Sequence, residues 1–214
     1  MTDDLAPLPD RISTSDGETL EATWSTADDP RAVAVLTHPH PLYGGDMHNI
    51  VPAALARSLP GHGIATLRFN FRSVGASTGQ HGGGDDEIAD VVAAIDAATT
   101  TFPGLPVIGV GYSFGADVML ATGDGRLAAV VAVAPPLAVL PAAQLEATRG
   151  AFSTLVLSPE HDQFRPAADA VAVTADWPDT SVVEIPGADH FLAGATSFVA
   201  DQVLGLVAAV IRPG

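Results

Sequence analysis

The stretch from Val107 to Thr122, VIGVGYSFGADVMLAT, decides the fold. Its first five residues form an apolar run that is typical of a strand covered on both faces of a sheet. Its last nine residues, 114–122, predict a helix. The residues between them, GYSFG at 111–115, form a Gly-x-Ser-x-Gly pentapeptide. The turn in this pentapeptide is so sharp that the residues two before and two after Ser113 cannot carry bulky side chains. A strand, a tight turn and a helix in this order predict a parallel α/β sheet.

The same alternation of strand-like and helix-like segments continues on both sides of this stretch. Apolar runs predict strands at 33–37, 64–71, 107–111, 128–134, 152–157 and 181–185, and helices are expected at 49–59, 85–101, 114–122, 166–175 and 195–211. The alternation predicts a mostly parallel central sheet with helices on both faces. Arg11 to Trp24, interrupted by Asp16-Gly17, predicts an antiparallel hairpin at the sheet edge.

Composition limits the classes of function. The 214 residues suit a single domain, 1–214. The formal net charge of −16, with arginine as the only basic side chain, argues against binding to nucleic acid or to an anionic membrane surface. The absence of cysteine excludes disulfides, thiolate metal sites and cysteine nucleophiles. No apolar run approaches the roughly 18 residues of a membrane span, and the acidic start MTDDLAPLPD does not resemble a secretory signal, so we expect a cytoplasmic protein.

Chemistry in an open α/β sheet belongs at the carboxyl ends of its strands. Ser113 follows the strand at 107–111 and opens a helix, where the backbone N–H of Phe114 can receive a developing oxyanion. This context predicts Ser113 as a nucleophile. A second Gly-x-Ser-x-Gly match, around Ser77, has no strand directly before it and no helix directly after it, so we interpret it as an ordinary loop.

Two further strand ends supply an acid and a base. Asp162 follows the strand at 152–157, with Glu160 as the alternative acid, and His190 follows the strand at 181–185. Ser113, Asp162 and His190 stand in the order nucleophile, acid, base, which is the chain order of a hydrolase triad on this kind of sheet. The three placements together predict a triad, although a single loop histidine would not.

The loop after the first central strand, 38–49, is expected to supply a second oxyanion N–H. Pro39 and Pro41 have no N–H, which leaves His40, Leu42 and Tyr43 as candidates.

Two other kinds of site are less well supported by the sequence. A metal site at His38, His40 and His48 lacks evident carboxylate partners, so we expect no metal. The glycines at 109, 111 and 115 miss the dinucleotide-binding spacing by one residue, and no acid follows the next strand to bind a ribose.

The segments HPHPLYGG (38–45) and FNFRSVGAS (69–77) give a more specific indication. With them, the chain resembles the α/β-hydrolase superfamily, and more closely its small, lidless bacterial members that carry a His-Pro-His-Pro-x-x-Gly-Gly loop. These members usually have glycine where Ser73 stands. The resemblance extends from about Val33 to the last helix. It implies Ser113 as nucleophile, His190 as base, Asp162 as orienting acid, and N–H donors at Phe114 and His40.

The expected function is hydrolysis of a small ester through an acyl-enzyme intermediate, without a cofactor and with a small-molecule substrate. A carboxylesterase is the best interpretation, and thioesterase or peptidase activity and a non-catalytic binding protein are the alternatives. Only about 17 residues separate the strands at 128–134 and 152–157, so we expect a loop and one short helix there and no large lid. Homo-oligomerisation is left open.

The sequence also predicts roles for individual side chains near the strand ends. Leu42 and Tyr43 are expected in the substrate pocket, with Phe114, Phe164 and Phe191 beside them. We expect Arg72 to pair with an acid of the helix at 85–101 rather than to bind substrate.

Overall fold

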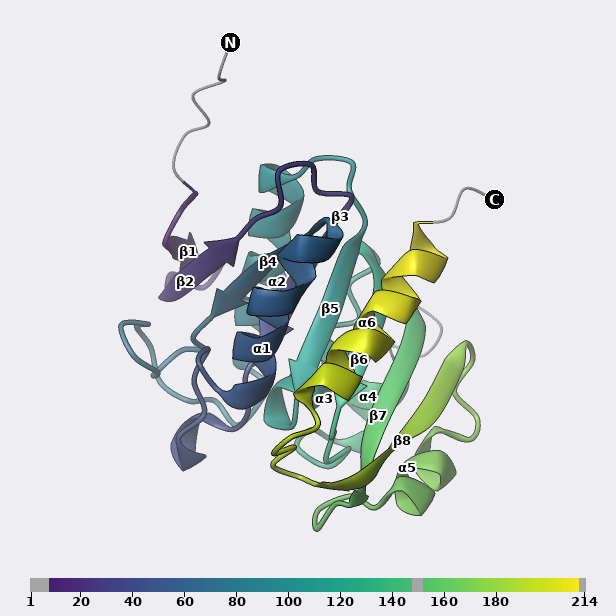
Figure 1. Ribbon diagram of the computed structural model, residues 1–214. Coiled ribbons are helices and arrows are strands. Elements are labelled where there is room, and N and C mark those ends of the chain that lie inside the picture. The colour runs from purple at the N-terminus through teal and green to yellow at the C-terminus, as the bar shows by residue number, and fades with distance from the viewer. Residues whose placement is uncertain (1–7, 148–151, 212–214) are drawn as a thin grey trace.

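A single β-sheet forms the centre of the computed structural model, which describes residues 8–147 and 152–211 (Figure 1). Within these residues the sheet has eight strands in the order β1-β2-β4-β3-β5-β6-β7-β8. The strands are β1 Arg11–Ser13, β2 Thr19–Ser25, β3 Ala32–Thr37, β4 Ile64–Phe69, β5 Val107–Tyr112, β6 Leu127–Val133, β7 Ser153–His161 and β8 Thr180–Asp189. Strands β3 to β8 pair with one another in parallel. Strand β1 pairs antiparallel with β2, and β2 pairs antiparallel with β4.

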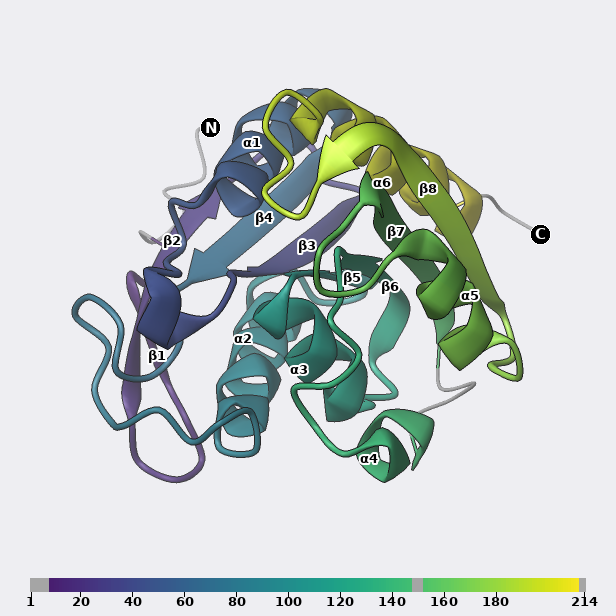
Figure 2. The same cartoon turned by 90° about the horizontal axis from the view of Figure 1, so that it is seen from below.

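Helices cover both faces of this sheet, as Figure 2 shows from below. Helices α1 and α6 lie on one face, and α2, α3, α4 and α5 lie on the other. The helices are α1 Ile50–Ser58, α2 Glu87–Thr101, α3 Phe114–Thr122, α4 Ala142–Ala147, α5 Ala167–Thr174 and α6 Thr196–Val210, with 3-10 turns η1 Pro41–Tyr43 and η2 Leu59–His62. The predicted α/β fold, with its mostly parallel sheet and its N-terminal antiparallel hairpin, is confirmed.

The sheet forms where the sequence is apolar without interruption. Every residue of β3 and of β5 is buried, because helices cover both of their faces. Side chains at alternate positions along each strand point to opposite faces of the sheet and belong to two separate hydrophobic clusters. One lies under α1 and α6, and the other lies under α2 and α3.

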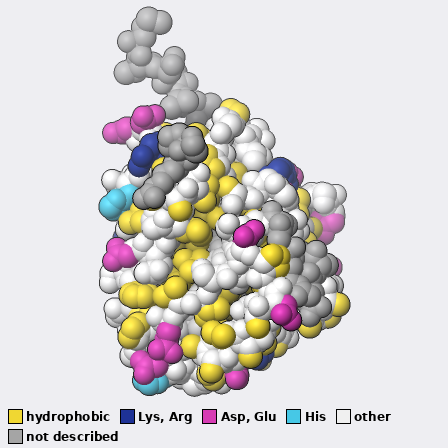
Figure 3. Space-filling view, turned by 90° about the vertical axis from the view of Figure 1, so that its right-hand side faces the viewer, with side chains coloured by type: hydrophobic (Ala, Val, Ile, Leu, Met, Phe, Trp, Pro, Cys, Tyr) yellow, Lys and Arg dark blue, Asp and Glu magenta, His cyan; other side chains and the backbone are white. Residues whose placement is uncertain are grey.

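The connection from β6 to β7 holds a loop and the short helix α4, as the sequence predicts, and its residues 148–151 lie outside the described residues. None of the helices in 8–147 and 152–211 combines the length and the hydropathy that crossing a bilayer requires. On the face shown in Figure 3, Asp and Glu side chains are spread singly between hydrophobic and neutral ones.

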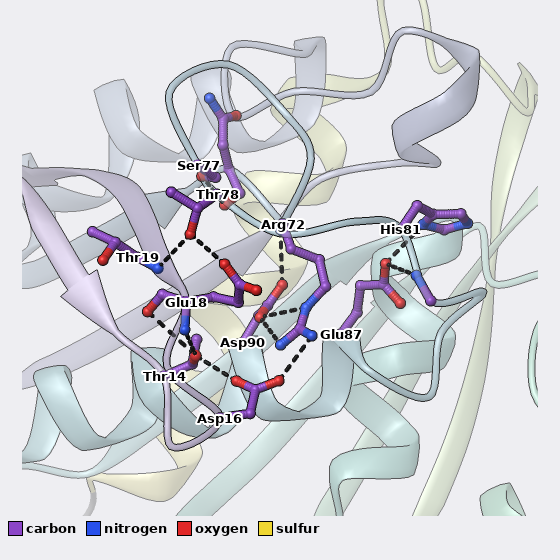
Figure 4. Close-up of polar contacts among 12 residues, drawn as sticks. Thr14, Asp16, Glu18, Thr19, Arg72, Ser77, Thr78, His81, Glu87 and Asp90 are labelled. Carbon is purple, nitrogen blue, oxygen red and sulfur yellow. Dashed lines mark hydrogen bonds and ion pairs between the residues drawn. The ribbon is translucent and has the colours of Figure 1, made fainter.

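A buried ion pair joins the hairpin to the sheet and to α2 (Figure 4). The Arg72 guanidinium donates to Asp90 Oδ1 from Nη2 at 2.7 Å and from Nε at 3.0 Å, and to Asp16 Oδ2 at 2.9 Å. Asp90 is fully buried, and burial raises the pKa of its carboxyl even though Arg72 lies beside it. The expected structural role of Arg72 is confirmed.

The segment after β4 ties the hairpin to the rest of the fold through Ser77. Its Oγ donates to the carbonyl of Asn70 at 2.8 Å and accepts from Glu21 N–H at 2.9 Å. Both contacts are backbone contacts, so Ser77 is a loop serine, as its sequence context indicates. Ser73, at the usual glycine position, has a φ of 70° and lies in the left-handed region that glycine occupies most readily.

Replacing Arg72 by leucine should lower the free energy of unfolding by about 3–5 kcal/mol, because the buried charge of Asp90 loses its partner. The double variant Arg72→Leu/Asp90→Asn should recover part of this loss, since no uncompensated charge remains. Urea unfolding of both variants and of the wild type measures the difference. If the free energy of unfolding of Arg72→Leu lies within about 1 kcal/mol of the wild-type value, the ion pair contributes little to stability.

Candidate active site

A cavity of about 870 Å³ lies at the carboxyl ends of the parallel strands. Its lining comes from the loops after β3, β5, β6, β7 and β8, and most of the exposed lining surface is apolar. The lining residues are Pro39, His40, Tyr43, Gly44, Gly45, Asn49, Ile50, Tyr112, Ser113, Phe114, Pro136, Ala138, Val139, Phe164, His190 and Phe191. None of these described lining residues is Asp, Glu, Lys or Arg.

The turn between β5 and α3 presents Ser113 to this cavity. Ser113 has φ 54° and ψ −120°, a backbone conformation that is strained for a residue with a side chain. The turn closes only because its flanks are glycines. A Cβ on Gly111 would lie 2.4 Å from Ala116 Cα, and one on Gly115 would lie 2.5 Å from the His38 carbonyl oxygen. The expectation that bulky residues cannot stand at these two positions is confirmed.

Ser113, His190 and Asp162 form a continuous chain of hydrogen bonds. Ser113 Oγ lies 2.8 Å from His190 Nε2, and His190 Nδ1 lies 2.8 Å from Asp162 Oδ2. All three residues are buried, with exposed fractions of 7%, 6% and 3%. The structure therefore brings together three side chains that are separated by 28 to 77 positions along the chain.

The acid of this chain is held ionised by its neighbours. Burial works against the charge of Asp162, but the hydrogen bonds from His190 and from the N–H groups of Arg165 and Phe164 outweigh it, and the pKa of this carboxyl lies below its ordinary value. Glu160, the alternative acid, accepts instead from Gly187 N–H at 2.7 Å. An ionised Asp162 can fix the tautomer of His190.

His40 and Phe114, the two expected N–H donors, line the same cavity as Ser113. Phe114 N–H belongs to the first turn of α3, where no helical carbonyl can accept it. Of the candidates in the loop after β3, Leu42 N–H donates to His40 Nδ1 at 3.2 Å and Tyr43 N–H donates to His40 O at 3.1 Å. His40 N–H makes no hydrogen bond to any of the described residues, so it is the candidate that stays available.

The expected pocket residues divide into two groups. Tyr43, Phe114, Phe164 and Phe191 all line the cavity. Leu42 is not among the residues that line it and is 68% exposed, so its place in the substrate pocket stays a prediction. Leu42 and Tyr43 lie on the same 3-10 turn, η1, where consecutive side chains point about 120° apart, and only Tyr43 faces the cavity.

Both ring nitrogens of His38 make hydrogen bonds to the backbone. Its Nε2 accepts from Phe71 N–H at 3.0 Å, so its Nδ1 carries the proton and donates to the Pro39 carbonyl at 2.6 Å. Burial lowers the pKa of His38 to about 4, which keeps the ring neutral. Within 8–147 and 152–211, no three His, Cys, Asp or Glu side chains are grouped as a metal site requires.

The glycines at 109, 111 and 115 serve packing rather than nucleotide binding. A Cβ on Gly109 would lie 2.5 Å from Met119 Sδ, and the other two let α3 approach the backbone around β3 and β5. This close packing explains why a near match to the dinucleotide-binding spacing occurs here.

Sequence reasoning missed three residues that support the site. Tyr112 OH donates to the carbonyl of His190 at 2.9 Å. The buried Asp117 carboxylate accepts three backbone N–H groups at 2.9 Å, all from the cavity loop 137–139, and Arg165 Nε donates to Pro136 O at 2.8 Å. Only Asp117 carried a signal in the sequence, because it is an acid inside an otherwise apolar helix.

Comparison with known families agrees with this geometry. Residues 28–157, more than half of the chain, match the family described as serine aminopeptidase, S33. The chain belongs to this family. It is thus an α/β hydrolase, and family members and structural neighbours alike indicate a serine hydrolase.

Solved structures share the fold over almost the entire chain. An α/β serine hydrolase homologue from Coxiella burnetii superposes with a TM-score of 0.80 at 27% identity, covering 92% of this chain and 95% of that one. A putative α/β hydrolase from Agrobacterium tumefaciens gives 0.81 at 25% identity, with 92% and 93% covered. A lidless serine hydrolase from Xanthomonas campestris gives 0.81 at 24% identity, with 95% and 94% covered, and this likeness shows the fold alone.

A curated relative is similar over part of its length. An uncharacterised protein of Rickettsia prowazekii is 37% identical over 103 residues, which are 47% of this chain and 43% of that protein. The chain therefore matches less than half of the length of this relative.

The buried His38 predicts a loss of stability in mild acid. The unfolded chain protonates this ring near its ordinary pKa of 6.5, whereas the folded chain does so only near 4. Between these values the unfolded state binds more protons, so His38 lowers the free energy of unfolding as pH falls, by up to about 3 kcal/mol in total.

His38→Gln removes this titration and retains a side-chain acceptor for Phe71 N–H. Urea unfolding from pH 7 to pH 4 should show the stability advantage of the wild type over the variant shrinking across this window. An advantage that stays constant with pH would contradict the buried neutral imidazole.

Proposed function

We propose that this chain is a carboxylesterase that cleaves small neutral esters through an acyl-enzyme intermediate on Ser113. The observation that carries the proposal is the pair of 2.8 Å hydrogen bonds joining Ser113, His190 and Asp162 at an apolar cavity. The strained turn at Ser113 and the free N–H of His40 support it further.

Acylation follows from these positions. Ser113 Oγ forms a bond to the carbonyl carbon of the ester while its proton passes to His190 Nε2. The carbonyl oxygen becomes an oxyanion and accepts hydrogen bonds from Phe114 N–H and His40 N–H, and each such donor typically contributes roughly 10²–10³ in rate. The carbon–oxygen bond of the alcohol then breaks, and the alcohol leaves with the proton from His190.

Deacylation repeats the sequence with water. His190 Nε2 takes a proton from water as the water oxygen bonds to the acyl carbon. The bond to Ser113 Oγ breaks, the serine regains its proton, and the acid departs. Asp162 stays ionised throughout, and it fixes the imidazole tautomer and stabilises the imidazolium.

The lining favours neutral esters over peptides with a free amino terminus. An α-ammonium group that binds against an apolar lining loses part of its hydration, and without a carboxylate partner this desolvation disfavours its binding. Among the described residues, no acid lines the cavity, and Asp162 is already bonded to His190. The aromatic rings of Tyr43, Phe164 and Phe191 suit an apolar acyl or alcohol group instead.

The wider setting is proposed on composition and charge. A net charge of −16 favours a small-molecule partner over nucleic acid or an anionic membrane, and we place the activity in the cytoplasm, on a single domain that needs no cofactor.

Ser113→Ala should reduce the hydrolysis of p-nitrophenyl butyrate by at least about 10³-fold, because the nucleophile is lost. Its thermal unfolding midpoint should stay within a few degrees of the wild type. The matched control is Ser77→Ala, which alters the other Gly-x-Ser-x-Gly serine and should retain turnover in its folded fraction. A fluorophosphonate probe should label the wild type at Ser113.

Retained esterase activity in Ser113→Ala would contradict the assignment of the nucleophile. A wild type that neither turns over esters nor reacts with the probe would favour the non-catalytic binding protein.

The uncharged lining predicts a substrate preference. The kcat/KM for a neutral ester such as p-nitrophenyl butyrate should exceed that for leucine p-nitroanilide by at least about 10²-fold, because the cavity offers no partner to the ammonium group. Steady-state kinetics on both substrates, and on a thioester of the same acyl group, measure the preference. Comparable rates on the anilide would favour an aminopeptidase.

A further inference from the structure

The two residues that are proposed to bind the oxyanion also touch each other through their side chains. The ring centroids of His40 and Phe114 lie 4.8 Å apart. His40 stands in the loop after β3, whereas Phe114 begins α3, so this contact joins the two backbones that carry the N–H groups. The inference drawn from it rests on the proposed function.

A third ring completes this cluster. His81, in the loop between β4 and α2, lies with its ring centroid 5.0 Å from His40 and 5.4 Å from Phe114. Its side chain is 12% exposed, and His81 is not among the residues that line the cavity. His81 therefore packs against both His40 and Phe114 without lining the cavity.

A fully buried carboxylate, that of Glu87, lies against His81 (Figure 4). Glu87 Oε1 lies 2.7 Å from His81 Nδ1 and accepts from Gly82 N–H at 3.0 Å, and Glu87 Oε2 accepts from Gly84 N–H at 2.7 Å. Glu87 is the first residue of α2, so it fastens the loop 81–84 to a rigid helix. The hydrogen-bond chain of Ser113 makes no use of this carboxylate.

We propose that His81, in the loop that Glu87 fastens to α2, is a positioning residue for the oxyanion-binding N–H groups of His40 and Phe114. The His40 loop needs such support because His40 lies between Pro39 and Pro41, and its own N–H must stay free to act as a donor. Misplacement of a catalytic group by about 1 Å can cost about 10²-fold in rate. The His81 ring restrains His40 against α3 and preserves the distance between the two N–H groups.

The test compares His81→Ala, which removes the ring, with His81→Phe, which keeps a ring but loses the contact with Glu87. His62→Ala, at an exposed histidine on η2, is the matched control. Each variant is assayed with p-nitrophenyl butyrate, and rates are divided by the concentration of reactive serine from fluorophosphonate titration, so that misfolded protein does not count. The dissociation constant of phenylboronic acid reports binding of a tetrahedral adduct at the serine.

His81→Ala should lower kcat by about 10–100-fold with KM within about twofold, because only the transition state uses the oxyanion donors. Phenylboronic acid should bind more weakly by a similar factor. His81→Phe should recover part of kcat, and His62→Ala should match the wild type.

Three results would overturn the inference. One is a kcat of His81→Ala within twofold of an active wild type. Another is a rise in KM at unchanged kcat, which would make His81 part of the substrate pocket. The third is a His81→Ala variant with a lower concentration of reactive serine but an unchanged kcat per reactive serine. Such a result would mean that His81 serves only folding. A wild type inactive toward both ester and probe would instead overturn the proposed function, and this inference with it.

Discussion

The close approach of α3 to the end of β3 is the constraint on which the site depends. It is possible only because Gly115 has no Cβ, which would lie 2.5 Å from the His38 carbonyl oxygen. Contact at this point turns the chain sharply between β5 and α3 and forces Ser113 into its strained conformation at the helix start. It also brings the loop that carries His40 beside Phe114, so one backbone contact determines where the serine and these two residues lie.

Buried polar groups on neighbouring elements hold the loops around the cavity. Asn70 Oδ1 accepts from Met47 N–H at 2.8 Å, which ties the loop after β3 to the end of β4. Asp117 bonds three consecutive N–H groups of the loop after β6, and Arg165 bonds Pro136 of the same loop. Such fastening reduces the reorganisation that a reaction would otherwise require, because the loops already occupy the positions that the chemistry uses.

The sequence predicted the sheet well because its parallel strands are buried on both faces. Strands β3 and β5 are apolar throughout, and the glycines around Ser113 have a steric explanation that the spacing alone reveals. The ends of β7 and β8 were placed up to four residues short, since Pro159 and Pro186 look like strand terminators although both lie within strands near the sheet edge.

Side-chain positions within loops were harder to predict, because tertiary contacts determine them. The serine, acid and base could be found, since each follows a strand whose carboxyl end lies at one edge of the sheet. The orientation of Leu42 depends on the 3-10 turn η1, and no periodic pattern of apolar residues in the sequence predicts this turn. His81 stands in a glycine-rich loop, and only the fold reveals that its ring reaches His40 and Glu87.

The uncharged cavity has a consequence for the departure of the products. Hydrolysis of a neutral ester creates a carboxylic acid that ionises at neutral pH. The part of the lining that the structure describes has no arginine to retain that anion, and the net charge of −16 repels it once it reaches the surface. For the proposed ester hydrolysis, apolar contacts in the cavity favour binding of the ester, and the negative net charge favours release of the acid product into solution.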